Sequence, residues 1–306
     1  MKILVATEKP FAIEATQEIK QIASAAGFEV VLLEKYSEKS ELLAAVKDAD
    51  AMIVRSDKVT KEVVEAAENL KIVVRAGAGY DNLDLESLTS KGVVAMNTPG
   101  QNSNAVAELA IGMMVFMARN CFSPGTGTEI SGKRLGIHAY GNVGRLVAKY
   151  GKAFGMTIYA YDPFITDKAV FDAEGVIMCS SQEELYSNSD YLSLHIPATA
   201  QTVGSINKAV LSLLPVGATL INTARKEVIN EAELCEFMAE RVDFKYATDI
   251  APANIAELTE KFGKRVFATA KKMGAESAEA NVNAAKAAAS QIVSFIKDGV
   301  TKFKVN

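Results

Sequence analysis

The sequence predicts an α/β protein made of two doubly wound units, each a parallel sheet with helices on both faces. Short, mostly β-branched apolar runs alternate with amphipathic helical stretches, and this alternation restarts after a long apolar helix near the middle of the chain. The chain has 306 residues, 49% of them hydrophobic, which is more than one core ordinarily uses. Continuous apolar strands separated by helices are typical of parallel sheets buried on both faces.

The first series of strands lies within the first hundred residues. Amphipathic helices are predicted over residues 11–25 and 60–70, the second with Thr60 as its N-cap. The strands of this series are predicted at residues 2–6, 29–33, 51–54, 71–74 and 93–95.

A second series follows the apolar helix predicted over residues 104–119 and the loose stretch 120–132. An alanine-rich helix over 277–297, closed by Gly299, is predicted near the end of the chain, and its alanines permit close packing. The strands of this series are predicted at residues 135–139, 157–161, 191–194, 219–222, 245–248 and 266–268.

Composition and charge exclude several classes of function. The 33 Lys and Arg nearly balance the 37 Asp and Glu, without runs of one sign, so no nucleic acid or anionic membrane partner is expected. The three scattered cysteines do not suggest a disulfide framework. The longest apolar run, 110–118, is too short to cross a membrane, and the first residues lack a signal peptide's apolar core. We therefore expect a soluble, cytoplasmic protein.

A dinucleotide site is predicted after the first strand of the second series. The sequence Ala-Tyr-Gly-Asn-Val-Gly there resembles the G-x-G-x-x-G fingerprint, with Ala139 in place of the first glycine. Gly141 would let the backbone approach a pyrophosphate, which would bind the amides of Asn142 and Val143 at a helix N-terminus. Gly144 would let that helix pack closely on the strand. Taken alone, the pattern also fits a tight strand–helix turn.

Asp162 favours the dinucleotide interpretation. It follows the next strand, eighteen residues after Gly144, where a carboxylate can accept both ribose hydroxyls of NAD and repel the 2′-phosphate of NADP. The sequence therefore predicts NAD as the cofactor. His195 ends a strand and is expected to line the cofactor edge, whereas His138 lies inside a strand and is more simply a core residue. No metal-ligand spacing occurs, and no metal is predicted.

Three arginines at the ends of predicted strands form a candidate anion site. Arg55 and Arg75 end strands of the first series, and Arg225 follows a strand of the second. Gly77 and Gly79, directly after Arg75, would expose backbone amides to the same anion. Ligands of such sheets bind beyond the carboxyl ends of the strands, so we expect an anionic substrate between the two units.

Six segments of the chain resemble the D-isomer-specific 2-hydroxyacid dehydrogenases, and within them the short D-3-phosphoglycerate dehydrogenases. The resemblance covers nearly the whole chain and rests on residues 75–85, 97–114, 139–144, 193–197, 220–228 and 248–252. It implies a flavodoxin-like split substrate domain, 1–97 plus 277–306, around a Rossmann nucleotide-binding domain, 98–276. It also implies a homodimer and the NAD-dependent oxidation of D-3-phosphoglycerate to 3-phosphohydroxypyruvate, in serine biosynthesis.

The resemblance also implies roles for individual residues. Arg225 matches the arginine that holds the substrate carboxylate and orients the reacting carbinol. Arg55 and Ser56 match the position used for the distal phosphate. Gly77 and Ala78 match the carboxylate-binding loop, and Asn102 matches a further substrate contact. For the cofactor, Asn142 and Val143 match the pair under the pyrophosphate, and Asp162 matches the ribose acceptor. The nicotinamide pocket is matched by Thr223, Ala224 and Asp249.

The chain departs from the family pattern at its acid/base. Lys272 stands in the place of the family's catalytic histidine, and Asn254 in the place of its supporting glutamate. A lysine beside Arg225 and Lys271 would be favoured in its neutral form, which can act as a base, so Lys272 is the predicted acid/base. An alternative is that both lysines are solvated surface residues. Of the two, Lys271 is the one that we expect to be solvated. The stretch 120–132 is shorter than the family's connecting arm, which leaves the usual dimer contact open.

Two alternatives remain open on the sequence alone. The substrate could be another 2-hydroxy acid, such as lactate, glycerate or a phosphorylated sugar acid, or the protein could be a non-catalytic NAD-binding sensor or interaction module. Arg55 and Lys58 argue against the uncharged tail of lactate. Arg225 and the anion loop argue against a sensor, which does not need them.

Overall fold

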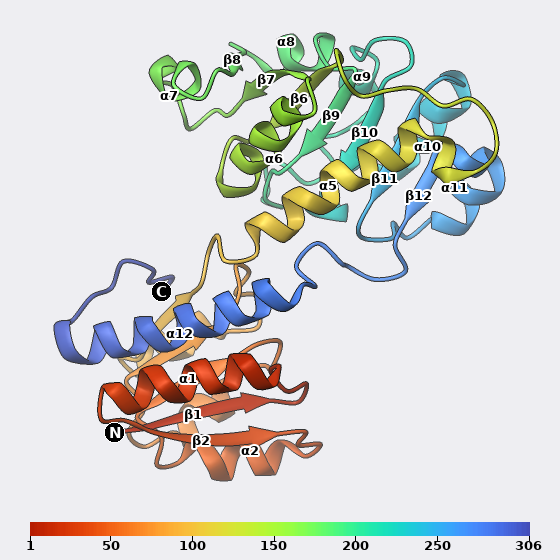
Figure 1. Cartoon of the computed structure of the whole chain (residues 1–306). Helices are drawn as coiled ribbons and strands as arrows, with labels where there is room; N and C mark the ends of the chain where they lie inside the picture. The colour runs from red at the N-terminus through yellow and green to blue at the C-terminus, as the bar shows by residue number, and fades with distance from the viewer. The chain divides into compact units, whose positions relative to one another are not determined.

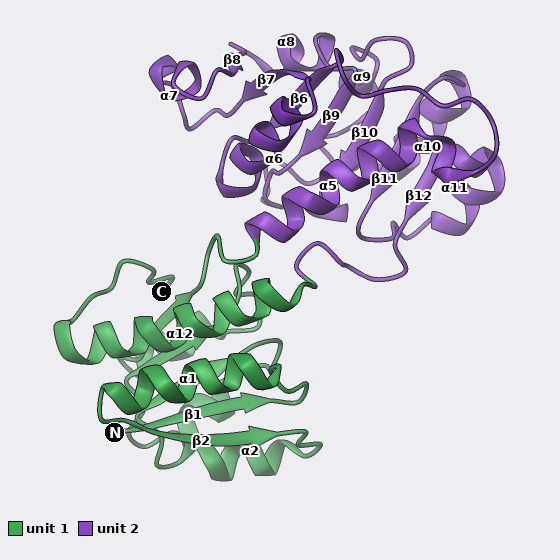
Figure 2. Ribbon diagram, viewed as in Figure 1, with its two compact units in different colours: residues 1–102, 276–306 green, residues 103–275 purple.

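The computed structural model describes residues 1–306 as two compact α/β units (Figures 1 and 2). Unit 1 comprises residues 1–102 and 276–306, and unit 2 comprises residues 103–275. Unit 1 is thus built from both ends of the chain, with unit 2 inserted between them. The predicted fold class, two parallel-sheet α/β units, is confirmed.

Unit 1 contains a five-stranded parallel sheet in the order β2-β1-β3-β4-β5. On β1, Leu4 and Ala6 pack into one core while Ile3 and Val5 pack into another, and all four are buried. The strand is apolar throughout because both of its faces are covered. The strands are β1 (Lys2–Thr7), β2 (Glu29–Glu34), β3 (Ala51–Val54), β4 (Ile72–Arg75) and β5 (Val94–Asn97).

Two helices, α1 (Ile13–Ala25) and α12 (Ala278–Asp298), lie side by side on one face of this sheet (Figure 1). The opposite face is covered by α2 (Lys39–Val46), α3 (Lys61–Ala66) and α4 (Leu85–Ser90). The buried positions of α12 are mostly alanines, which allow the close approach that the sequence predicts: Ala280, Ala284, Ala285, Ala288 and Ala289.

The ends of α12 carry the capping groups that the sequence indicates. Ser277 Oγ accepts the Ala280 N–H at 3.1 Å, which satisfies one of the unpaired donors of the first turn. Gly299 closes the helix with φ +68°, a left-handed conformation that glycine adopts at little cost.

Unit 2 contains a seven-stranded parallel sheet in the order β12-β11-β10-β9-β6-β7-β8. One face is covered by α5 (Ser103–Ala118), α6 (Asn142–Ala153) and α7 (Lys168–Asp172). The other face carries α8 (Gln182–Ser187), α9 (Lys208–Leu211), α10 (Glu231–Glu240) and α11 (Ile255–Phe262). The strands are β6 (Arg134–His138), β7 (Thr157–Tyr161), β8 (Ile177–Met178), β9 (Tyr191–Leu194), β10 (Thr219–Asn222), β11 (Lys245–Thr248) and β12 (Val266–Ala268).

Among the predicted helices, α3 differs most from its predicted range. Thr60 is the N-cap residue of α3, as predicted, although its buried hydroxyl makes no capping hydrogen bond. The helix ends at Ala66 instead of residue 70. Lys91 Nζ donates to the carbonyls of Val64, at 2.5 Å, and Ala67, at 2.5 Å, and so satisfies acceptors that a longer helix would pair internally.

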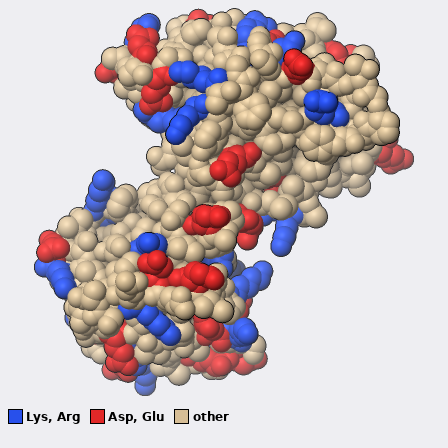
Figure 3. All heavy atoms as spheres, viewed as in Figure 1, with Lys and Arg blue, Asp and Glu red and all other residues tan.

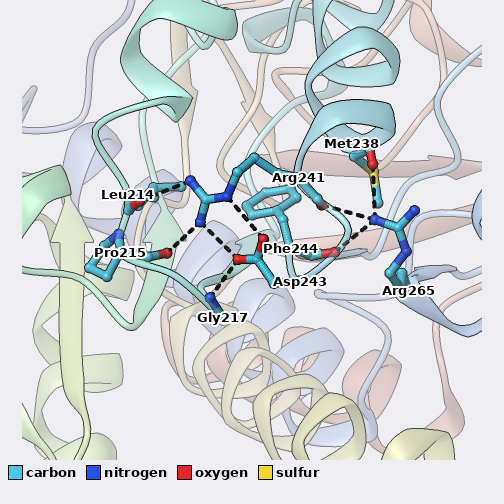
Figure 4. A network of polar contacts seen from close by, with 8 residues as sticks. All are labelled: Leu214, Pro215, Gly217, Met238, Arg241, Asp243, Phe244 and Arg265. Atoms are coloured by element: carbon cyan, nitrogen blue, oxygen red, sulfur yellow. Dashed lines mark hydrogen bonds and ion pairs between the residues drawn. The ribbon is translucent and has the colours of Figure 1, made fainter.

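An arginine network fastens the loops at one end of the unit 2 sheet (Figure 4). Arg241 Nη2 donates to the Pro215 carbonyl and to Asp243 Oδ2, both at 2.8 Å, and Asp243 also accepts the Gly217 N–H at 2.6 Å. The Arg241 guanidinium holds the pKa of Asp243 well below its usual value. Arg265 Nη1 donates to the Arg241 carbonyl at 3.0 Å, which ties the segment before β12 to the end of α10. These contacts precede β10 and β11, so we assign them to stability.

Charged side chains of both signs are interspersed on the face seen in Figure 3, consistent with the small net charge of −4. None of the helices combines the length and the apolar composition needed to cross a bilayer.

Candidate functional site

The glycine-containing loop between β6 and α6 has the geometry of a phosphate-binding turn. Helix α6 begins at Asn142 with Gly141 as its N-cap, and the space beside the Gly141 Cα is open. A Cβ on the buried Gly144 would lie 2.3 Å from the Ala139 carbonyl oxygen, so only glycine lets α6 approach β6 this closely. Amides at the start of α6, including that of Val143, therefore border open space where an anion can bind.

Ala139 carries backbone strain in this loop. It has φ +78°, in the left-handed region that favours glycine, and it occupies the place of the fingerprint's first glycine. A non-glycine residue there costs about 1–2 kcal/mol. Such strain persists only where surrounding contacts hold the conformation.

Asp162 follows β7 and is tied to the same loop. Its Oδ2 accepts the Tyr140 N–H at 2.8 Å, and its Oδ1 accepts the Phe164 N–H at 2.9 Å. The side chain is partly exposed. Each carboxylate oxygen has a second lone pair, so both can still accept a hydroxyl from a ligand.

Buried acceptors without partners lie at the ends of β10 and β11. Asp249 is fully buried; its Oδ2 accepts the Gly274 N–H at 2.7 Å, while its Oδ1 has no partner. The Thr223 hydroxyl is also buried and unpaired. Burial raises the pKa of Asp249, opposed by the Gly274 N–H and by the charges of Lys272 and Arg225. A buried acceptor of this kind fits the carboxamide of a nicotinamide ring, so the residues present fit NAD.

Lys272 and Arg225 meet at one backbone oxygen. Lys272 Nζ donates to the Ala224 carbonyl at 2.9 Å, and Arg225 Nη1 donates to the same oxygen at 3.1 Å. Asn222 braces this turn, because its Nδ2 donates to the Arg225 carbonyl at 3.0 Å and its Oδ1 accepts the Ala224 N–H at 3.0 Å. The neighbouring Lys271 is exposed. The structure thus brings the two predicted catalytic residues of unit 2 together.

Asp249 also fixes the segment that carries Lys272. A Cβ on Gly274 would lie 2.7 Å from Asp249 Oδ2, so a larger residue would displace the hydrogen bond that anchors this segment. Asn254, at the position of the family's glutamate, donates from Nδ2 to the Glu231 carbonyl at 3.3 Å. Its Oδ1 is buried without a partner.

Both histidines of unit 2 have lowered pKa values; His138 is buried, whereas His195 is partly exposed. His138 is 6% exposed, its Nδ1 lies 3.1 Å from the Tyr186 hydroxyl, and burial lowers its pKa to about 4. His195 Nε2 lies 3.0 Å from the Ser193 hydroxyl, and burial lowers the pKa of His195 to about 3. Neither is suited to proton transfer near neutral pH.

Acid is expected to destabilise the fold through His138. Above about pH 6.5 the ring is neutral in both states; below it, the unfolded chain takes up a proton that the folded state resists until about pH 4. The free energy of unfolding should therefore fall by about 1.4 kcal/mol per pH unit in this window. Urea unfolding of wild type and His138→Gln at pH 7 and pH 5 measures this, and the wild type should lose about 2 kcal/mol more. Equal losses in the two proteins would contradict the assignment.

Arg55 follows β3 in unit 1 and contacts only neutral groups. Its Nη2 donates to Asn281 Oδ1 at 2.7 Å and its Nη1 to the Pro10 carbonyl at 3.4 Å, and the guanidinium lies 5.3 Å from the centre of the Phe11 ring. No carboxylate neutralises its charge. Ser56, next in the chain, is exposed.

The loop after β4 presents free amides. A Cβ on Gly77 would lie 1.6 Å from Arg75 Nη1, so glycine is needed for the arginine to pack there. The carbonyls of Gly77 and Ala78 accept from Thr98 N–H at 2.9 Å and Asn97 Nδ2 at 2.6 Å. The N–H groups of Ala78 and Gly79 have no partner within the protein, which leaves them for an anion. Asn102, the last residue of this part of unit 1, is partly exposed.

Comparison with known proteins identifies the family. Residues 117–265 match the model of the D-isomer specific 2-hydroxyacid dehydrogenase NAD binding domain. A solved structure of NAD⁺-bound 3-phosphoglycerate dehydrogenase from Entamoeba histolytica is 47% identical in sequence and has a TM-score of 0.88. The match covers 100% of this chain and 98% of the Entamoeba histolytica chain. This chain belongs to the D-isomer-specific 2-hydroxyacid dehydrogenase family. The predicted family of NAD-dependent dehydrogenases and the predicted cofactor, NAD, are thereby confirmed.

Other members of the family differ in length and in name. Hydroxypyruvate reductase of Thermotoga maritima is 37% identical over 68% of this chain and 71% of its own length. D-3-Phosphoglycerate dehydrogenase of Methanocaldococcus jannaschii is 37% identical over 75% of this chain, but the match spans only 44% of that enzyme. The chain therefore spans less than half the length of this curated relative.

Sequence reasoning missed two features near the predicted site, one a hydrogen bond and the other a buried side chain. Asn281, the partner of Arg55, lies 226 residues further along the chain, and no local pattern connects the two. Tyr140 lies within the glycine-containing loop yet is fully buried. A bulky aromatic residue in such a loop was a signal that could have been followed.

Proposed function

We propose that the protein oxidises D-3-phosphoglycerate to 3-phosphohydroxypyruvate with NAD, as in serine biosynthesis, and acts as a homodimer. The main support is the meeting of Lys272 and Arg225 at the Ala224 carbonyl, in the NAD-binding unit that also holds the buried Asp249 carboxylate. A 2-hydroxy acid needs a cation for its carboxylate and a base for its hydroxyl, and this pair can supply both. The 47% identical relative from Entamoeba histolytica is named as a 3-phosphoglycerate dehydrogenase.

Each residue then has one chemical task. When bound, NAD supplies the acceptor for the hydride from C2 of the substrate. Arg225 binds the substrate carboxylate and orients the carbinol, and Lys272 Nζ, in its neutral form, takes the hydroxyl proton. In the reverse direction, the protonated lysine returns that proton to the forming alkoxide. Arg55 binds the distal phosphate, and the free amides of Ala78 and Gly79 add donors for an anionic group.

The proton-accepting role requires Lys272 to spend part of its time neutral. The positive charge of Arg225 on the same carbonyl favours the neutral amine, whereas the carboxylate of Asp249 opposes it. The neutral Asn254 in place of a glutamate adds no second opposing charge. A glutamate assists a histidine by stabilising its charged form, but it would keep a lysine protonated and unable to act as a base.

A second candidate is the interconversion of D-glycerate and hydroxypyruvate. It is favoured by the Thermotoga maritima relative named hydroxypyruvate reductase and by the fact that Arg55 already donates to Asn281. The two candidates differ in the phosphate alone, so Arg55 separates them.

Arg55→Ala is expected to raise the KM for D-3-phosphoglycerate by about 10- to 150-fold. A charge-assisted hydrogen bond contributes about 1.5–3 kcal/mol, and removing the guanidinium removes it. The KM for D-glycerate and the Kd for NAD should stay within twofold of wild type. Lys61→Ala, which removes an exposed lysine paired with Glu65, is the control and should change nothing. An unchanged KM for D-3-phosphoglycerate in Arg55→Ala would favour the glycerate reaction.

A further inference from the structure

The side chain of Tyr140 is anchored beneath the cofactor loop. Although Gly141 and Asn142 next to it are exposed, Tyr140 is fully buried. Its ring stacks on Phe171 of α7, with ring centres 4.8 Å apart and planes at 24°. Its hydroxyl donates to Glu174 Oε2 at 2.5 Å. The loop is therefore tied through one side chain to the segment that follows α7.

Glu174 connects this anchor to helix α6. Its other carboxylate oxygen forms an ion pair with Arg145 of the first turn of α6, and the Arg145 guanidinium lies 5.1 Å from the centre of the Tyr140 ring. Lys152, further along α6, donates to the Glu174 carbonyl at 2.6 Å. Glu174 thus joins the loop, the start of α6 and the segment after α7, and α6 and α7 pack into the same core on one face of the unit 2 sheet.

The backbone N–H of Tyr140 links the anchored loop to the carboxylate of Asp162. The Tyr140 N–H donates to Asp162 Oδ2 at 2.8 Å, directly after the left-handed Ala139. A strained residue relaxes when the contacts that hold it are lost. Relaxation at Ala139 would rotate the peptide that follows and withdraw the N–H that donates to Asp162.

We propose that Tyr140 and Glu174 are positioning residues that orient Asp162 and thereby set the preference for NAD over NADP. The proposal rests on the proposed role of Asp162 as the ribose acceptor. A carboxylate held in one orientation both accepts the ribose hydroxyls and repels a 2′-phosphate, whereas a carboxylate free to turn away does each less well.

The test is calorimetric titration of NAD and NADP into wild type, Tyr140→Phe, Glu174→Ala and Glu174→Gln. Tyr140→Phe keeps the stacked ring and loses only the hydroxyl, so it should weaken NAD binding about tenfold and lower the ratio of the NADP Kd to the NAD Kd about tenfold. Glu174→Ala should weaken NAD binding and lower the Kd ratio to a similar extent. Glu174→Gln keeps an acceptor for the phenol, so its NAD affinity and its Kd ratio should lie close to those of the wild type. Asp172→Asn removes an exposed ion pair with Lys168 on α7 and should leave both constants unchanged.

The ratio of the two constants separates orientation from general destabilisation. If Tyr140→Phe and Glu174→Ala lower both affinities equally, the ratio stays at the wild-type value and the positioning role is overturned. If Asp162→Ala collapses the ratio but neither Tyr140→Phe nor Glu174→Ala moves it, Asp162 keeps its role and the proposal fails alone. If Asp162→Ala leaves the ratio unchanged, the ribose-acceptor role fails, and the positioning proposal fails with it.

Discussion

Lys272→Ala is expected to lower kcat for D-3-phosphoglycerate by about 10²–10⁴-fold, the contribution of a positioned general base. Hydride leaves C2 only as the hydroxyl proton is accepted, and Lys272 Nζ shares the Ala224 carbonyl with the arginine proposed to hold the substrate carboxylate. The Kd for NAD should stay unchanged, because the hydrogen bond from the Gly274 amide still holds Asp249 in the variant.

Two further variants separate base chemistry from charge. Lys272→Arg keeps a cation that cannot lose its proton near neutral pH, so its kcat should fall as far as that of the alanine variant. Lys271→Ala, in the exposed neighbour, should cost much less. Turnover by Lys272→Ala within fivefold of wild type would show that another group is the acid/base.

NADP should be used about 30- to 1000-fold less efficiently than NAD, judged by kcat/KM. The 2′-phosphate would lie against the Asp162 carboxylate, and a close pair of like charges in a partly desolvated site costs roughly 2–4 kcal/mol. Asp162 is held at both oxygens by backbone N–H groups, so it cannot turn away without breaking two hydrogen bonds.

Asp162→Ala should reduce this discrimination to less than tenfold while weakening NAD itself. Asp167→Ala is a matched control, because Asp167 caps the N-terminus of α7 a few residues further along the chain. Efficiencies of the wild type with NADP and NAD within tenfold of each other would refute the role of Asp162.

Much of the fold could be predicted because its strands are buried on both faces and therefore read as continuous apolar runs. The structure places β7, β9, β10, β11 and β12 at the predicted limits. The two-residue β8 is too short to show any pattern. The end of α3 depends on Lys91, which lies 24 residues beyond Ala67 and caps the helix through tertiary contact. A tertiary contact therefore sets this helix end, which the local periodicity of apolar residues does not determine.

The same distinction holds for the candidate site. The glycine-containing loop and Asp162 lie within one strand–helix–strand unit, so their spacing alone indicates a shared ligand. Lys272 reaches the Ala224 carbonyl across 48 residues, and Arg55 reaches Asn281 across 226. Neither contact leaves a trace in local sequence, and only the folded chain shows them.

The most direct test of the proposed reaction is a steady-state assay of the wild type with NAD and three substrates, D-3-phosphoglycerate, D-glycerate and D-lactate. We expect NADH formation with the highest kcat/KM for D-3-phosphoglycerate, at least tenfold above D-glycerate, because the phosphate gains the Arg55 guanidinium. D-Lactate should be the poorest, since it offers no charged tail. A higher kcat/KM for D-glycerate or D-lactate, or no turnover of any of the three, would contradict the assignment.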